Sequence, residues 1–127
     1  MRIHHIGIAC QDIDVELRRI ERVHSLTHCS GIVYDRSQEA HVCYLEIEGG
    51  IPLELISGKK VASFVARGMT YYHLCYEVND MDVEIDRLRG GGALLVSPPT
   101  PAVLFEGRRV AFMYMPYGLV ELLEAQE

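Results

Sequence analysis

The sequence lacks four features that would each place it in a familiar class of proteins. No run of apolar residues approaches the roughly eighteen that a membrane-spanning helix needs, and no apolar segment typical of a signal peptide follows the N-terminus. None of the four cysteines belongs to a Cys-x-x-Cys motif, so we expect reduced thiols in a cytoplasmic protein. Lysine and arginine number 12 against 18 aspartate and glutamate, and the resulting net charge of -6 disfavours nucleic acid and anionic membranes as partners.

The rest of the composition is that of an ordinary globular protein. Hydrophobic residues make up 49% and charged residues 24% of the chain, which does not favour disorder. A chain of 127 residues buries about two-thirds of the surface of its unfolded state, so it can fold without disulfides. We therefore predict one domain that spans residues 1–127.

The most informative pattern is an internal repeat. The segment that begins at His5 aligns with the segment that begins at His73, 68 residues later. Near the end of each half a second pair of segments aligns, with Glu54 on Glu121 at a spacing of 67 residues. A period this long does not suit a solenoid and indicates a duplicated half-domain. We assign the first module to about residues 1–57 and the second to about 69–127, with a junction at about 58–68.

Each half reads as a strand, a helix and roughly three further strands, which predicts an α+β fold. The predicted strands lie at residues 3–9, 32–35, 42–47, 51–56, 70–78, 93–96, 109–115 and 119–124. The predicted helices lie at residues 13–23 and 81–89, with a short helix or turn in the junction. We expect residues 25–31 to end the first helix, and residues 97–101, which include three prolines, to form a loop.

The strand at residues 70–78 carries a histidine among aromatic and aliphatic neighbours. Because side chains alternate along a strand, His73 shares a face with Cys75 and Glu77. We expect the opposite face to contribute to the core through Tyr72, Leu74, Tyr76 and Val78.

Glutamate also lies in apolar strands, at Glu54 and at Glu121. A single histidine or glutamate in a strand is more typical of a hydrogen-bonded core residue or of a solvated face. The duplication changes this interpretation, because each half has a histidine in its first strand and a glutamate in its last. If the halves pack about a pseudo-twofold axis, His5, Glu54, His73 and Glu121 converge, and two imidazoles with two carboxylates suit one divalent metal ion (Co, Ni, Mn, Zn, Fe or Mg).

Other candidate residues have weaker patterns. His24 and His28 have the i, i+4 spacing of a helical metal pair, but they lie where the helix is expected to end. Cys75 is more typical of a small buried side chain than of a nucleophile. Arg108 and Arg109 are candidates for binding a phosphate or carboxylate of a substrate, and solvated charge is the alternative.

Four motifs in order resemble the vicinal oxygen chelate superfamily over residues 3–124. They are His-x-Gly-Ile-Ala at 5–9, Leu-Glu-Leu-Ile at 53–56, His-Leu-Cys-Tyr-Glu-Val at 73–78 and Val-Glu-Leu-Leu at 120–123. The resemblance implies two tandem βαβββ modules that form a curved, half-barrel mixed sheet around a metal site. It also implies that the metal ligands are His5, Glu54, His73 and Glu121, and that the protein is a homodimer.

Within this superfamily the motifs are most similar to those of methylmalonyl-CoA epimerases. That resemblance implies a metal-dependent epimerase or isomerase that acts through the enolate of a small acyl thioester or 2-oxo substrate. Glu121 is the first candidate for the catalytic base, and Glu54 is the second catalytic carboxylate. The epimerases have a further glutamate before the third strand, where this sequence reads Ser-Gln-Glu-Ala at 37–40, so Glu39 is a poor match.

Two alternatives stay open. Epimerases usually have glutamine at the position of Glu54, and glutamate there is more similar to lactoylglutathione lyase (glyoxalase I). A non-catalytic protein that binds a small molecule, such as a resistance protein, is the other alternative, although such relatives often lack the metal ligands.

Overall fold

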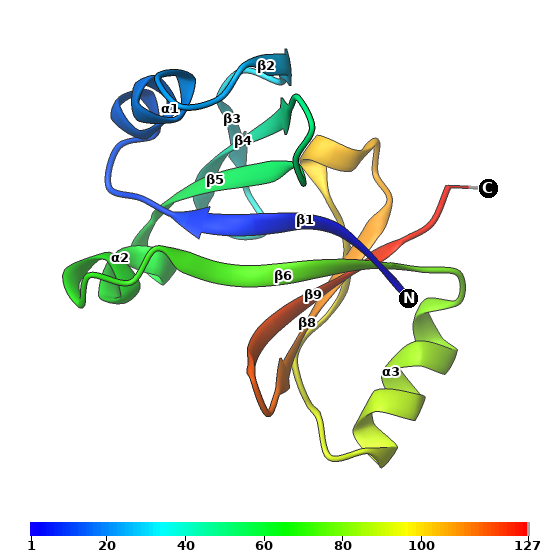
Figure 1. The fold of residues 1–127 in the computed structure, drawn as a ribbon. Helices are drawn as coiled ribbons and strands as arrows, with labels where there is room; N and C mark the ends of the chain where they lie inside the picture. Colours follow the sequence, from blue (N-terminus) through cyan, green and yellow to red (C-terminus); the bar gives the residue numbers. More distant parts are fainter. Residues whose placement is uncertain (127) are drawn as a thin grey trace. The chain divides into compact units, whose positions relative to one another are not determined.

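The computed structural model describes residues 1–126, which form three α-helices and nine β-strands (Figure 1). Their contacts divide the chain into two compact units. We call residues 5–72 the N-terminal unit, and residues 73–126 together with residues 1–4 the C-terminal unit. The predicted α+β class is confirmed.

The N-terminal unit contains the following elements, of which the first strand begins in the other unit: β1 (Arg2–Ala9), α1 (Ile13–Glu21), β2 (Leu26–Cys29), β3 (Val33–Asp35), β4 (Ala40–Ile47), β5 (Leu53–Gly58) and α2 (Lys59–Ala66). Its strand order is β2-β4-β5-β1, and β3 also pairs with β4. The β1–β5 pair is parallel, and the pairs that β4 makes are antiparallel.

The C-terminal unit repeats this arrangement with the following elements, of which the first strand begins in the other unit: β6 (Tyr71–Val78), α3 (Met81–Gly90), β7 (Leu94–Pro101), a 3-10 turn (Val103–Phe105), β8 (Arg109–Met115) and β9 (Gly118–Glu124). Its strand order is β6-β9-β8-β7. The β6–β9 pair is parallel, whereas β8 is antiparallel to both of its neighbours. In each unit the strand that precedes the helix therefore pairs in parallel with the last strand.

The helix that follows the first strand begins in the same way in both units. Asp12 lies at the N-cap of α1 and its carboxylate accepts a hydrogen bond of 3.2 Å from the backbone N–H of Val15. Asp80 caps α3 with a bond of the same length from the N–H of Val83. Each cap satisfies a backbone donor that the helix itself leaves without an acceptor.

The helix of each unit covers one face of its strands. The core of the C-terminal unit consists of Val78, Met81, Ile85, Leu88, Ala93, Ala111, Met113, Val120 and Leu122. The core of the N-terminal unit includes Cys10, Ile13, Cys43, Leu45 and Leu55. Since side chains alternate along a strand, Glu54 and Glu121 point to the face opposite the helix. The fold thus places both glutamates away from α1 and α3.

Burial along β6 agrees with the prediction only in part, since Tyr72 and Leu74 on the expected core face are half-buried. Val78 lies in the core and Tyr76 packs against it, as expected. His73 and Cys75, on the other face, are also buried, with exposed fractions of 4% and 0%. Both faces of this strand are therefore covered at its centre.

Two segments that were not predicted as strands belong to edge strands. Residues 26–29 form β2, whose short and mostly exposed sequence has no clear strand pattern. Residues 97–101 belong to β7, where a loop was predicted because of the prolines. β7 is at the edge of its unit and its register shifts twice, and proline is tolerated at such positions because no ladder partner needs its N–H.

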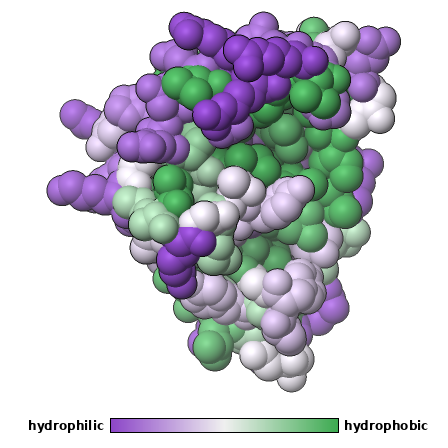
Figure 2. Space-filling model, turned by 60° about the vertical axis from the view of Figure 1, so that its left-hand side comes forward, coloured by the Kyte–Doolittle hydropathy of each residue, from purple (hydrophilic) through white to green (hydrophobic). Residues whose placement is uncertain are grey.

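Both units expose large hydrophobic side chains. Val23 and Tyr71 are each 76% exposed, and Leu94 is 67% exposed. Hydrophobic residues, in green, are visible between hydrophilic ones on the face drawn in Figure 2. No helix in residues 1–126 has both the length and the hydrophobicity needed to cross a membrane.

Candidate functional site

The N-terminal unit contains a buried pair of possible metal ligands. His5 comes from β1 and Glu54 from the parallel strand β5, where Glu54 lies opposite Gly7 in the register. The Nε2 atom of His5 is 3.5 Å from the Oε1 atom of Glu54. The two residues are 0% and 2% exposed.

The C-terminal unit contains a pair with the same design. His73 comes from β6 and Glu121 from the parallel strand β9, where Glu121 lies opposite Cys75. The Nε2 atom of His73 is 3.3 Å from the Oε1 atom of Glu121, and both side chains are buried. In both units the glutamate is thus opposite the residue two positions after the histidine. We call these the two His–Glu pairs.

The donor atoms of each His–Glu pair fit a metal ion chemically. A buried carboxylate is costly unless a cation or hydrogen bonds compensate its charge, and a divalent ion supplies that charge. Two donors that lie about 2.1 Å from one ion, at angles of about 90° to 109°, are about 3.0 to 3.4 Å apart. The nitrogen-to-oxygen distances of 3.5 and 3.3 Å are close to this range. Each pair offers two donors, and such ions take about four to six ligands.

An aromatic ring lies next to the histidine in each unit, and the sequence analysis missed both rings. Tyr44 of β4 lies opposite Glu54, and its ring meets the His5 imidazole edge to face, with 6.1 Å between the ring centroids. Phe112 of β8 lies opposite Glu121 and meets His73 in the same way at 5.4 Å. These residues are also 68 positions apart, so the repeat spacing is a signal for them once the strand register is known.

The helical metal pair of His24 and His28 does not form. α1 ends at Glu21, and His28 lies on β2 opposite Glu46. Both histidines are exposed. The i, i+4 spacing has no meaning here because the two residues are not on one helix.

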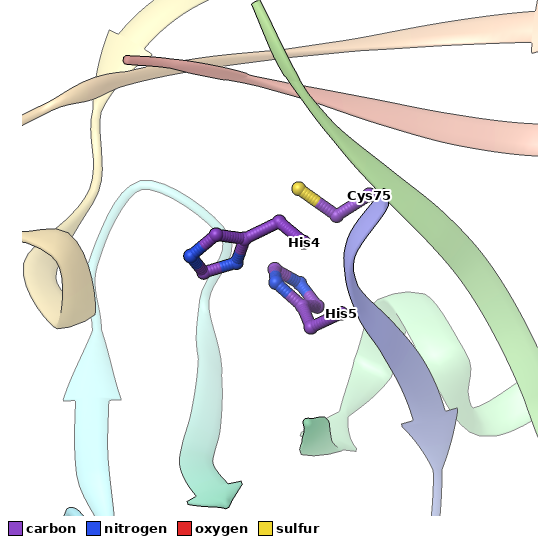
Figure 3. A group of neighbouring side chains, drawn as sticks. All are labelled: His4, His5 and Cys75. Carbon is purple, nitrogen blue, oxygen red and sulfur yellow. The ribbon is translucent and has the colours of Figure 1, made fainter. Parts of the chain in front are cut away.

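Cys75 is fully buried, as predicted for a small apolar side chain. Figure 3 shows it on β6 together with His4 of β1, which belongs to the same unit. The His4 ring packs edge to face on Phe105 with 5.4 Å between centroids. His4 is thus part of the packing of the C-terminal unit.

The two arginines predicted to bind substrate are in ion pairs within the C-terminal unit. Arg108 donates hydrogen bonds of 2.6 Å to the carboxylate of Glu77 and to the backbone carbonyl of Glu124. Arg109 donates to the Glu124 carboxylate at 3.1 and 2.8 Å. These contacts give both arginines a structural role, and substrate binding by them stays a prediction. Glu39, the poor match to the epimerase base, is exposed in the turn before β4 with a φ of 50°.

Glu77 connects two segments of the C-terminal unit. Its carboxylate accepts hydrogen bonds from Arg2 at 2.7 Å and from Arg108 at 2.6 Å. These hydrogen bonds hold the pKa of Glu77 below its ordinary value of 4.5, although burial opposes the shift. The bond from Arg2 has the largest effect. The ionised form is therefore the one that the folded protein stabilises.

Replacing Glu77 with glutamine is expected to lower the free energy of unfolding at pH 7 by about 1–3 kcal/mol, because Arg108 is left half-buried without its anion. A lowered pKa in the folded state gives stability that is present above the ordinary pKa and is lost as the pH falls through the folded value. The difference between the wild type and Glu77→Gln should therefore shrink below about pH 4, as measured by urea unfolding at several pH values. Glu84→Gln, which removes the partner of the more exposed Arg87, is the control. A difference that stays constant from pH 7 to about pH 3 would contradict this assignment.

Comparison with known proteins adds a family and a fold. The sequence model of the Glyoxalase/Bleomycin resistance protein/Dioxygenase superfamily matches residues 4–112. No curated protein sequence matches the chain. Among solved structures, a hypothetical protein from Bacillus halodurans is similar with a TM-score of 0.81 and 26% identity, over 99% of this chain and 95% of that one.

Two solved epimerases have the same fold. Methylmalonyl-CoA epimerase from Mycobacterium tuberculosis has a TM-score of 0.78 and 23% identity, over 99% of this chain and 89% of that one. A Streptomyces coelicolor methylmalonyl-CoA epimerase variant in complex with 2-nitronate-propionyl-CoA has a TM-score of 0.76 and 22% identity, over 100% of this chain and 99% of that one. At these identities the similarity establishes the fold.

Proposed function

Because the chain belongs to the Glyoxalase/Bleomycin resistance protein/Dioxygenase superfamily, we propose that it is a metal-dependent epimerase or isomerase of a small acyl thioester. The observation that carries the proposal is that both His–Glu pairs are buried and that their strands pair in the same register. The solved epimerases of the same fold support the substrate class, since one of them is a complex with methylmalonyl-CoA.

In this proposal both His–Glu pairs bind one divalent ion. Each pair provides one imidazole nitrogen and one carboxylate oxygen, so neither pair alone completes a coordination shell. Two pairs provide four protein ligands and leave positions for substrate oxygens. Two carboxylates also balance the charge of a divalent ion, which removes the cost of burying Glu54 and Glu121.

The metal ion, when bound, would polarise a substrate carbonyl and stabilise the negative charge that develops on its oxygen as the α-proton leaves. The protein residues then have to move that proton. A carboxylate has two oxygens, so Glu121 can hold the ion through one and accept a proton at the other. Glu54 has the corresponding position in the N-terminal unit and is the second candidate. Tyr44 and Phe112 pack edge to face on the two imidazoles, and in this proposal they help to orient them.

The test is α-proton exchange. Purified protein loaded with Co²⁺, Ni²⁺ or Mn²⁺ is incubated in D₂O with a panel of acyl-CoA thioesters that includes methylmalonyl-CoA, and deuterium incorporation is followed by mass spectrometry. We expect metal-dependent incorporation at the α-carbon of at least one thioester. If no thioester of the panel incorporates deuterium, the proposal that the protein is an isomerase is rejected.

A glyoxalase I-type lyase is the second candidate, and Glu54 is the residue that favours it. If the protein is an epimerase in which Glu121 is the base, Glu54→Gln should retain activity, since epimerases usually have glutamine at this position. If the protein is a lyase, wild-type protein should convert the adduct of methylglyoxal and a thiol, and Glu54→Gln should lose this activity. Tight binding of a small molecule without turnover of either substrate would instead indicate a binding protein.

A further inference from the structure

Two cysteines of the N-terminal unit lie side by side. The Sγ atom of Cys29 is 3.7 Å from the Sγ atom of Cys43. Cys29 is the last residue of β2 and is exposed, whereas Cys43 is in β4 and is fully buried. The pair thus combines one thiol that small molecules can reach with one that is protected.

The strand that carries Cys29 is short and lies at the edge of its unit. β2 has four residues, and its register with β4 shifts between Leu26 and His28. Cys29 lies opposite Leu45, so Cys43 is its diagonal neighbour. A disulfide needs a sulfur-to-sulfur distance of about 2.05 Å, so the sulfurs must approach by about 1.7 Å. Because β2 is hydrogen-bonded to a neighbouring strand on one side only, we expect it to allow this shift.

We propose that Cys29 and Cys43 form a reversible intramolecular disulfide when the protein meets a low-molecular-weight disulfide. The thiolate of Cys29 attacks one sulfur of the oxidant, which forms a mixed disulfide and releases one thiol. The thiolate of Cys43 then attacks the Cys29 sulfur and releases the second thiol. The two cysteines lose two hydrogen atoms in total, and the oxidant is reduced to two thiols.

The order of the two steps follows from the surroundings of the thiols. Burial, together with the nearby Cys29 thiol, raises the pKa of Cys43 to about 11. Cys43 is therefore mostly protonated at neutral pH and is a poor first nucleophile. Of the four cysteines, all within residues 1–126, only Cys29 is exposed, so the first attack should be confined to it.

The disulfide would act on the neighbouring His–Glu pair through Tyr44. The N–H of Ser30, the residue after Cys29, donates to the carbonyl of Tyr44 at 2.9 Å, and the N–H of Tyr44 donates to the Ser30 hydroxyl at 2.9 Å. The Tyr44 ring contacts His5. This step rests on the proposed function. A shift of Tyr44 should weaken metal binding about tenfold, as the loss of a residue that orients a metal-binding histidine does.

The disulfide itself is tested without any assay of activity. The reduced protein is treated with glutathione disulfide, and intact mass and peptide mapping are measured after alkylation of the remaining thiols. We expect a loss of two hydrogen atoms per chain, a cross-link between the peptides of Cys29 and Cys43, and full reversal by dithiothreitol. A stable glutathione adduct on Cys29, a cross-link between chains, or no reaction would overturn the proposal.

Three variants make the test specific. Cys43→Ala should stop at the mixed disulfide on Cys29, whereas Cys10→Ala, a buried control in the same unit, should form the internal cross-link like the wild type. If Cys43→Ala does not fold, Cys29→Ser replaces it in the test, because Cys29 is exposed and its substitution should not disturb the core. An internal cross-link that still forms in Cys29→Ser contradicts the proposed disulfide. Cobalt titration of the reduced and oxidised wild type then tests the coupling. A cross-link with unchanged metal affinity rejects only the coupling, and a protein that binds no metal rejects the proposed function.

Discussion

Replacing Glu121 with glutamine is expected to lower the rate of α-proton exchange by about 10²–10⁴-fold, which is the usual contribution of a positioned general base. Glutamine keeps the shape of the side chain but removes its negative charge and its ability to accept a proton. Because Glu121 is 1% exposed, water cannot easily take over its role. The measurement is deuterium incorporation into the thioester substrate, with the metal content of each sample determined in parallel.

The matched control is Glu84→Gln in the same unit. Glu84 lies on α3 and pairs with the exposed Arg87. This variant should exchange the α-proton at the wild-type rate. Equal rates for Glu121→Gln, Glu84→Gln and wild type would show that the buried carboxylate takes no part in the chemistry.

The second large effect concerns stability. Addition of Co²⁺ at about 100 times its dissociation constant should raise the free energy of unfolding by about 2.7 kcal/mol, because the ion binds the folded state only. For a chain of this length the melting temperature should rise by about 10 °C, and a chelator should reverse the rise. Differential scanning fluorimetry with and without the ion measures both changes.

The variants His5→Ala and His73→Ala give this prediction its sharpest form. If one ion needs both His–Glu pairs, either substitution alone should remove nearly the whole metal-induced rise in melting temperature. His41→Ala is the control, since His41 is exposed on β4 and its ring contacts Tyr34 rather than a buried carboxylate. If each pair bound its own ion, each single variant would keep about half of the stabilisation.

The candidate ligands could be predicted because duplication marks them twice. A histidine in one strand is ambiguous, but His5 and His73 occupy corresponding strands, and each has a glutamate in the strand that pairs with it in parallel. The aspartate caps were also predictable from the same repeat, since Asp12 and Asp80 precede helices with the same acidic first turn. The two halves thus share the residues that begin each helix and the buried histidine and glutamate of each pair.

β2 and the second half of β7 could not be predicted as strands for a physical reason. Strand patterns arise from alternate burial, and β2 is mostly exposed, so residues 26–29 show no alternation. In β7 the prolines oppose a central strand but not an edge one, and position in the sheet depends on contacts distant in sequence. The contact between Cys29 and Cys43 depends on β2 and was missed with it.

The aromatic neighbours of the histidines were missed for another reason. Tyr44 and Phe112 differ in residue type, and neither has a side chain that suggests metal chemistry. Their role becomes visible only when the strand register places them opposite Glu54 and Glu121. A tyrosine and a phenylalanine at the repeat spacing are informative only after the spacing has been assigned a structure.

We propose that the two His–Glu pairs together hold one metal ion. The most direct test is the metal content per chain, measured by elemental analysis of protein prepared without affinity metal and then saturated with Co²⁺ and dialysed. We predict one ion per chain for the wild type and almost none for either His5→Ala or His73→Ala. Two ions per chain in the wild type, or the loss of only one of two in each variant, would contradict the account.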